Sequence, residues 1–250
     1  MIPTYVINLD RAKARLERVM KQLMSESAFH IHRIPGVDGK YEDFSNISLD
    51  TTQTMKYFGQ PLSKGTVGCY LSHVNAWQTF VNSKEPYGLI LEDDVVLDAP
   101  VLWRLIQDLC KIQNGMWDIC SFQLNHRGMP LRVMSLGGYR MCTYLACVTG
   151  AGAYLLTAKG ANLLLRQAFP IVFPVDHYYT KSHRLGTRFI GIEPRPVTQA
   201  EGTSFIDEIG RERLRTLSLW QRVRCGTRRI WEEAQQGFYN ARWGYFFYRW

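Results

Sequence analysis

The stretch GLILEDDVVL, residues 88–97, decides how the fold is interpreted, because an apolar run ends in three consecutive carboxylates. A short apolar run of this kind is typical of a buried strand. Glu92, Asp93 and Asp94 would then lie at the carboxyl end of that strand. Adjacent carboxylates repel one another, so the stretch is either a site for a hard divalent cation such as Mg²⁺ or Mn²⁺, or a solvated acidic turn.

Strands and helices are predicted to alternate on both sides of this stretch. Residues 4–9 are a β-prone run, and the apolar residues that follow recur at the 3.6-residue spacing of an amphipathic helix. A further helix is predicted over 68–81, directly before a strand at 88–91. Later segments continue the pattern, with helices around 102–109 and over 158–168, and strands over 119–124 and 143–148. This alternation predicts an α/β fold with a mostly parallel sheet, whose ligands bind beyond the carboxyl ends of the strands.

The positive charge of the chain is concentrated at one end. Of the net charge of +8 over 250 residues, +6 comes from residues 211–250, which hold nine Arg against three Glu and also ten aromatic residues. Arg with Trp and Tyr is typical of binding to an anionic membrane surface, although a helix packed on the domain could have the same composition. No DNA- or RNA-binding motif accompanies the charge, so no nucleic-acid partner is expected. We predict a domain over 1–210 and a helical tail over 211–250.

Cysteine usage and hydropathy favour a cytoplasmic protein. The six cysteines form no CxxC pair and no regular spacing, so neither a zinc module nor a disulfide framework is indicated. The sequence has no secretory leader pattern and no apolar run long enough for a transmembrane helix. Together with the tail, this predicts a peripheral location on the cytoplasmic face of an inner membrane.

Two more segments carry candidate chemistry. In GTVGCYLSH, residues 65–73, Gly68 is predicted to open the helix, and Ser72 and His73 would lie in its first turns. Helix N-termini bind anionic oxygens, so His73 is either a ligand for a sugar or phosphate or a structural residue. In PVDHYY, residues 174–179, Asp176 is either a helix N-cap or a general base.

Six segments, taken in this order, resemble glycosyltransferase family 25, whose members take part in lipooligosaccharide and lipopolysaccharide biosynthesis and are often galactosyltransferases. They are VINLDRAKAR (6–15), GVDGK (36–40), GTVGCYLSHVNAW (65–77), LILEDDVVL (89–97), TGAGAYLLTAKGANLLL (149–165) and PVDHYY (174–179). The resemblance implies a GT-A fold, which is Rossmann-like, together with a UDP-sugar donor, a Mn²⁺ or Mg²⁺ ion and inversion at the anomeric carbon.

The resemblance also implies roles for individual residues. Asp176 would be the catalytic base, and Asp94 with Glu92 would hold the metal. The residues expected at the nucleotide sugar are Asn8, Arg11, Arg15, Asp38, Gly39, Gly68, Ser72, His73, Glu92, Asp93 and Gly150. No His follows His183 to serve as a late metal ligand, and residues 194–206 offer only Gln199, Glu201 and Ser204 for that place.

The resulting hypothesis is a bacterial inverting transferase that moves a sugar, galactose as first choice, from a UDP-sugar to a lipid-linked oligosaccharide. The product would carry a β-glycosidic bond. Three alternatives stay open: a UDP-glucose-dependent enzyme of the same family, a metal-dependent nucleotide-sugar phosphohydrolase, and a non-catalytic scaffold at a membrane surface.

Overall fold

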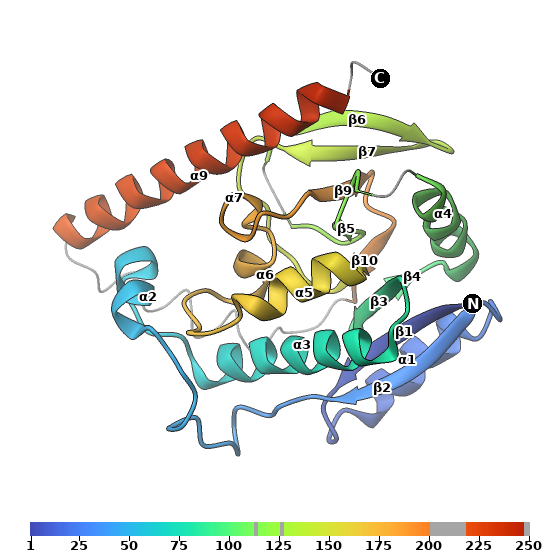
Figure 1. Ribbon diagram of the computed structural model, residues 1–250. Helices are drawn as coiled ribbons and strands as arrows, with labels where there is room; N and C mark the ends of the chain where they lie inside the picture. Colours follow the sequence, from blue (N-terminus) through green and yellow to red (C-terminus); the bar gives the residue numbers. More distant parts are fainter. Residues whose placement is uncertain (113–114, 126–127, 201–218, 248–250) are drawn as a thin grey trace.

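A computed structural model describes residues 1–112, 115–125, 128–200 and 219–247. Glu201, Ser204 and the first part of the predicted tail lie outside the described residues. The chain forms an α/β fold around an eight-stranded sheet (Figure 1). In spatial order the strands are β2 (Phe29–Pro35), β1 (Ile2–Asn8), β3 (Tyr87–Glu92), β8 (Ala153–Thr157), β5 (Ile119–Ser121), β9 (Phe189–Glu193), β7 (Tyr139–Tyr144) and β6 (Pro130–Leu136).

Two strands of the described sheet, β8 and β7, run against all the others. Strands β2, β1 and β3 are parallel neighbours, so their carboxyl ends meet at one edge of the sheet. The predicted α/β fold, with most strands pointing the same way, is therefore confirmed.

Helices cover both faces of the sheet, because the side chains of its inner strands alternate between two apolar cores. Tyr5 and Ile90 face the core built with α3, α5 and α6, whereas Val6 and Leu89 face the core built with α1 and α4. The helices are α1 (Lys13–Leu23), α2 (Thr51–Phe58), α3 (Lys64–Ser83), α4 (Ala99–Lys111), α5 (Ala158–Arg166), α6 (Val175–Tyr178), α7 (Ser182–Leu185) and α9 (Leu219–Phe247). In the part of the chain described, no helix has the length and hydropathy needed to cross a membrane.

Helix α3 begins earlier than predicted. Its N-cap is Ser63, whose hydroxyl accepts a hydrogen bond from the Thr66 backbone N–H at 3.1 Å. The prediction that Gly68 opens the helix is therefore wrong. Gly68 is needed inside α3 for a different reason: a Cβ at this position would lie 2.5 Å from the carbonyl oxygen of Val37. The glycine thus lets the loop after β2 pack directly against α3.

Helix α9 lies across one end of the sheet, next to α2, α7, β7 and β6 (Figure 1). Its inner face carries the buried Glu232, Gln236 and Asn240. The Glu232 carboxylate accepts hydrogen bonds from Arg184, Lys181 and His183, and from the Tyr57 hydroxyl at 3.0 Å. Burial raises the pKa of Glu232, but hydrogen bonds from His183 and Arg184 outweigh it, so that the net shift lowers this pKa.

Replacing Glu232 by Gln should destabilise the protein, because Lys181 and Arg184 would lose their shared charged partner. Removing one member of a buried ion pair costs about 3–5 kcal/mol. We expect about 2–3 kcal/mol here, since Arg184 is partly exposed and can be solvated. Urea unfolding at neutral pH would measure the loss, with the neighbouring exposed Glu233→Gln as control.

The destabilisation caused by Glu232→Gln should depend on pH. The pKa of Glu232 is depressed in the folded state, so its stabilisation is present above the ordinary value of 4.5 and is lost as pH falls through the lower, folded value. The gap in unfolding free energy between wild type and Glu232→Gln should therefore shrink below pH 4.5. A gap that stays constant down to acid unfolding would contradict this interpretation.

Candidate functional site

The acidic run lies at the end of a parallel strand, as predicted. Strand β3 ends at Glu92, and Glu92 pairs in register with Ile7 of β1. Asp93 and Asp94 form the turn into β4 (Val95–Leu97), which pairs antiparallel with β10 (Val197–Gln199). The backbone N–H of Ala200 donates to the Asp94 carbonyl oxygen at 2.8 Å. The late segment 197–200 is therefore held beside the carboxylates.

Both oxygens of the Asp93 carboxylate have partners within the protein. Its Oδ2 accepts a hydrogen bond of 2.6 Å from the Asn8 amide, and its Oδ1 lies 3.5 Å from an Arg15 nitrogen. The Asn8 oxygen in turn accepts from Arg33 Nε at 3.1 Å. Asp93 thus connects the ends of β1 and β3 and brings the first turn of α1 close to the acidic run.

Asp94 has one carboxylate oxygen without a partner among the described residues. Its Oδ1 is buried and has no hydrogen bond within the described residues, and its Oδ2 lies 3.9 Å from Arg15. Burial, reinforced by the nearby charge of Glu92, raises the pKa of Asp94 to about 6. A buried polar atom without a partner calls for a ligand. An oxygen ligand set of Asp94 and Glu92 suits Mg²⁺ or Mn²⁺, which complete their shells with water and phosphate oxygens.

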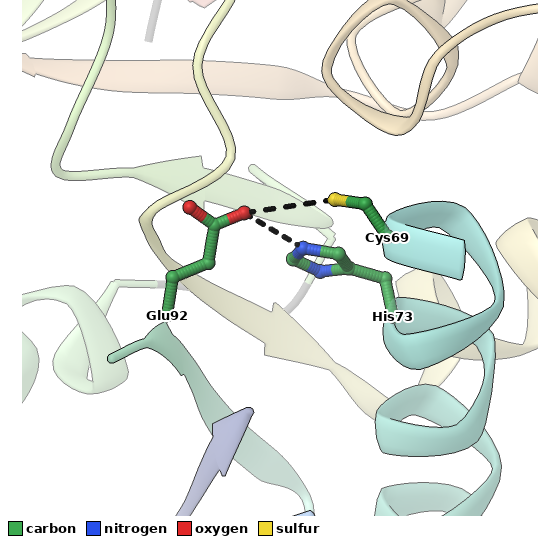
Figure 2. A group of neighbouring side chains, drawn as sticks. All are labelled: Cys69, His73 and Glu92. Atoms are coloured by element: carbon green, nitrogen blue, oxygen red, sulfur yellow. Dashed lines mark hydrogen bonds and ion pairs between the residues drawn. The ribbon is translucent and has the colours of Figure 1, made fainter. Parts of the chain in front are cut away.

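Glu92 is oriented by α3 through a chain of hydrogen bonds (Figure 2). Nε2 of the fully buried His73 lies 3.2 Å from Glu92 Oε1, and its Nδ1 lies 2.7 Å from the Tyr154 hydroxyl. Trp77 Nε1 donates to the same hydroxyl at 2.8 Å. The assignment that satisfies every group has Tyr154 donating to Nδ1 and Nε2–H donating to Glu92. In this structure His73 therefore positions Glu92.

Cys69 lies one turn before His73, with its Sγ 4.0 Å from Glu92 Oε1 (Figure 2). Cys69, His73 and Glu92 are close enough together to hold a metal ion, and this mixed donor set suits Zn²⁺ better than Mg²⁺. Burial, followed by the charges of Glu92, Asp176 and Asp94, raises the pKa of the Cys69 thiol. Oxygen ligation through Asp94 and Glu92 is the alternative that suits Mg²⁺ or Mn²⁺.

Asp176 approaches the same place from α6. The interpretation of Asp176 as an N-cap is wrong, because Pro174 occupies that position and Asp176 lies inside the helix. Its Oδ1 accepts from the backbone N–H of His177 at 2.9 Å. The charge of Asp176 raises the pKa of both Cys69 and Tyr179, after the larger effect of burial. Asp176, Glu92 and Asp94 are therefore each near enough to Cys69 for their charges to raise the pKa of its thiol.

Gly150 contacts Tyr179 through its backbone. Its carbonyl oxygen accepts a hydrogen bond from the Tyr179 hydroxyl, and its φ of +107° is a conformation that favours glycine. A Cβ there would also lie 2.9 Å from Gln123 Oε1. The nucleotide-sugar contact expected at Gly150 stays a prediction.

The predicted nucleotide residues divide into two groups. Arg11 Nε donates to Asp38 at 2.6 Å, a bond that holds the pKa of Asp38 below its usual range. Arg11 and Arg15 are both partly exposed at the rim of the site. Ser72, in contrast, is buried and accepts from the Val37 N–H at 2.8 Å while donating to the Gly68 carbonyl. Ser72, Gly68 and Gly39 therefore hold the loop after β2 against α3, and sugar contacts from them stay a prediction.

Comparison with known proteins places this geometry in a family. The profile described as "Glycosyltransferase family 25 (LPS biosynthesis protein)" matches residues 1–179. The chain belongs to glycosyltransferase family 25. The GT-A fold expected of the family is confirmed by the central sheet, with helices on both faces and the acidic run at the end of β3. Residues 180–250, including α9, lie beyond the match.

The relatives of this family 25 chain include proteins named as galactosyltransferases and proteins named as inactive. The chain is 28% identical over 186 residues to procollagen galactosyltransferase 1 of Danio rerio, covering 70% of this chain and 30% of that protein. It is 30% identical over 192 residues to the human protein named inactive glycosyltransferase 25 family member 3, with the same coverage. Among solved structures, a glycosyltransferase involved in glycosylation of the major capsid of PBCV-1 matches at a TM-score of 0.42 and 8% identity, covering 85% of this chain and all of that one. The match thus spans about 30% of the length of these curated relatives.

Two side chains at this family 25 site, Cys69 and Tyr154, were not predicted from the sequence, whereas Gln199 was named only as one of the residues available in the late segment. Cys69 and Tyr154 lie within quoted motifs, but only the fold shows that they contact Glu92 and His73. Gln199 lies beside Asp94, and a hydrogen bond from its side chain lowers the pKa of Asp94 against the larger effect of burial. The pairing of β10 with β4 brings Gln199 there, and no local pattern predicts such a pairing.

Proposed function

We propose that this chain is an inverting glycosyltransferase that moves galactose from UDP-galactose to a saccharide of lipooligosaccharide or lipopolysaccharide, forming a β-glycosidic bond. The observation that carries this proposal is the acidic run at the end of β3, where the buried Asp94 Oδ1 has no partner among the described residues. Such an oxygen suits a cation and diphosphate, and Asp176, whose charge acts on the same Cys69 thiol as Glu92 and Asp94, is the carboxylate that we assign to the acceptor. Inversion in a single displacement requires one group that stabilises the leaving diphosphate and another that takes the proton of the acceptor hydroxyl.

In the proposed reaction, Asp176 removes the proton from an acceptor hydroxyl as that oxygen forms a bond to the anomeric carbon. The bond from that carbon to the diphosphate oxygen breaks, and UDP leaves with the electron pair. Attack from the opposite face converts an α-linked donor into a β-linked product. A Mn²⁺ or Mg²⁺ ion held by Asp94 and Glu92 would supply charge neutralisation at the diphosphate. Arg15, and Arg11 across the rim, add positive charge on the same side.

A donor and acceptor panel tests this function. UDP-galactose, UDP-glucose and UDP-N-acetylglucosamine are each supplied with Mn²⁺ or EDTA, and UDP release is scored with truncated lipooligosaccharide, with a procollagen peptide, and without acceptor. Release from UDP-galactose that needs both metal and lipooligosaccharide supports the proposal. Preference for UDP-glucose or for the peptide corrects the substrate, and release without acceptor favours the phosphohydrolase.

We also propose that α9 attaches the protein to an anionic membrane surface, where a lipid-linked acceptor would be found. Ile230, Trp231 and Phe238 are exposed, with relative accessibilities of 68%, 66% and 74%. At the helical repeat these three lie on one face, opposite the buried Glu232, Gln236 and Asn240. Exposed aromatic residues on a basic helix are suited to the headgroup region of a bilayer.

The double substitution Trp231→Ser and Phe238→Ser should weaken sedimentation with vesicles containing phosphatidylglycerol by about tenfold or more, because two rings leave the bilayer interface. The fold should be kept, since both side chains are exposed. Tyr41→Ser, at an equally exposed aromatic residue far from α9 in the sequence, is the matched control. Equal sedimentation of the double variant and wild type would contradict membrane attachment through this face.

A further inference from the structure

A cavity of about 200 Å³ lies between the family-matched part of the chain and α9. Aromatic rings form one part of its wall, among them Tyr57, Phe58 and Phe173. Polar side chains of α9 form another part, namely Glu232, Glu233, Gln236 and Asn240. Ligand sites combine a mainly apolar lining with a few fixed polar groups in this way.

The polar groups of this α9 cavity are held in place by the protein. Gln236 donates to the Thr180 carbonyl at 2.9 Å, and its Oε1 lies 2.6 Å from His183 Nδ1. Asn240 donates to the Tyr144 carbonyl at 2.8 Å. Side chains fixed by such bonds present their remaining donors and acceptors without a further ordering cost when a ligand binds.

The α9 cavity lies beside the candidate base. His177 and Thr149 line it, and they are the chain neighbours of Asp176 and Gly150. The backbone of the candidate base is thus one residue away from the lining of the cavity, since consecutive Cα atoms are only about 3.8 Å apart. The carboxylates at the end of β3 are not part of its lining. The cavity is therefore separate from the metal and diphosphate end of the site.

We propose that the α9 cavity binds the acceptor saccharide and that α9 helps to select it. This inference rests on the proposed transferase function. A sugar ring has C–H groups that pack on aromatic faces and hydroxyls that need both donors and acceptors, which is the lining observed. The volume is below the roughly 300–1,000 Å³ of a site for a drug-sized ligand, so it suits one sugar unit at the end of a longer acceptor.

The charges of the α9 cavity disfavour an anionic group. Lys181 and Glu232 in the lining lie 3.4 Å apart and bind each other, and the exposed Glu233 adds a further negative charge. A phosphate would have to break this pair against the charge of Glu233, and a lipid chain would leave the fixed polar groups of α9 unpaired. A sugar hydroxyl can bond to these groups as they stand.

Two bulky substitutions would close the α9 cavity, one from the loop after β7 and one from α9. Ala146→Trp fills it from the loop after β7, and Glu233→Trp, at an exposed position of α9, covers it from the helix. Ala234→Trp is the matched control, because Ala234 is exposed on the same helix and does not line the cavity. The probe is the de-acylated core of truncated lipooligosaccharide, so that membrane binding plays no part.

Both cavity variants should raise the KM for this core saccharide at least about tenfold while UDP binding by calorimetry stays unchanged, and Ala234→Trp should change neither. The proposal is overturned if a folded cavity variant keeps the acceptor KM within about twofold of wild type. If the wild type transfers no sugar at all, the proposed function fails, and saccharide binding is then followed directly by saturation-transfer NMR. Saccharide binding that is lost in both cavity variants would still support the acceptor proposal. The proposal would be overturned by unchanged saccharide binding in the variants or by no saccharide binding to wild type. It would also be overturned if only a procollagen peptide bound in a way that the cavity variants abolish.

Discussion

Asp176→Asn should lower kcat by about 10²- to 10⁴-fold, because a positioned general base contributes a factor of that size. Asn has the same shape and an oxygen that can accept the bond from the His177 N–H, now 2.9 Å from Asp176 Oδ1. The fold of α6 should therefore survive, but the amide cannot take up the acceptor proton. UDP-sugar affinity should stay within about twofold of wild type, since the diphosphate end of the proposed site lies at Asp94 and Glu92.

The measurement is steady-state turnover of UDP-galactose with lipooligosaccharide acceptor, alongside calorimetric binding of UDP to the same preparation. Asp43→Asn is the control, because Asp43 is an exposed loop carboxylate bonded to its neighbour Ser45. Near-native kcat in Asp176→Asn would exclude this residue as the base. Joint loss of turnover and UDP binding would instead show that Asp176 supports the donor site.

The position of the acidic run could be predicted because its cause is local. An apolar strand followed by carboxylates is visible in one short stretch, and parallel strands place their carboxyl ends at one edge of the sheet. The same reasoning predicted β1, α1 and α4 close to their observed limits. Where the cause of an element was not local, the prediction was less accurate: 143–148 was expected as a strand, but β7 runs over Tyr139–Tyr144 because it pairs with β6 and β9.

The connections within the site depend on contacts between distant parts of the chain. Glu92 is held by His73, which lies 19 residues before it in the chain. His73 in turn contacts Tyr154, 81 residues further along. The sequence marked His73 as a ligand or a structural residue, but only the packing of β8 beside β3 shows that it positions Glu92. The packing of α9 on the domain likewise depends on Glu232 meeting Lys181, His183 and Arg184 of a distant segment.

Asp94→Asn should remove the metal-dependent part of UDP binding. The change keeps the size of the side chain but removes the charge that would attract a divalent cation, so the diphosphate would lose its main counter-charge. We expect addition of Mn²⁺ to tighten UDP binding at least about tenfold in wild type and less than about twofold in the variant. Calorimetric titration of UDP with Mn²⁺ and with EDTA measures this difference. Asp108→Asn, on α4 and paired with Lys111, is the control carboxylate.

The pKa of Asp94 gives this prediction a second readout. Burial and the neighbouring Glu92 raise that pKa to about 6, so protons compete with the metal below pH 6 while Asp94 is ionised above it. The Mn²⁺-dependent gain in UDP binding should therefore be full at pH 7.5 and fall as pH drops through 6. A site formed by Cys69, His73 and Glu92 instead would keep the gain in Asp94→Asn and would favour Zn²⁺ over Mn²⁺. The variant and the choice of ion together thus decide which carboxylates hold the metal.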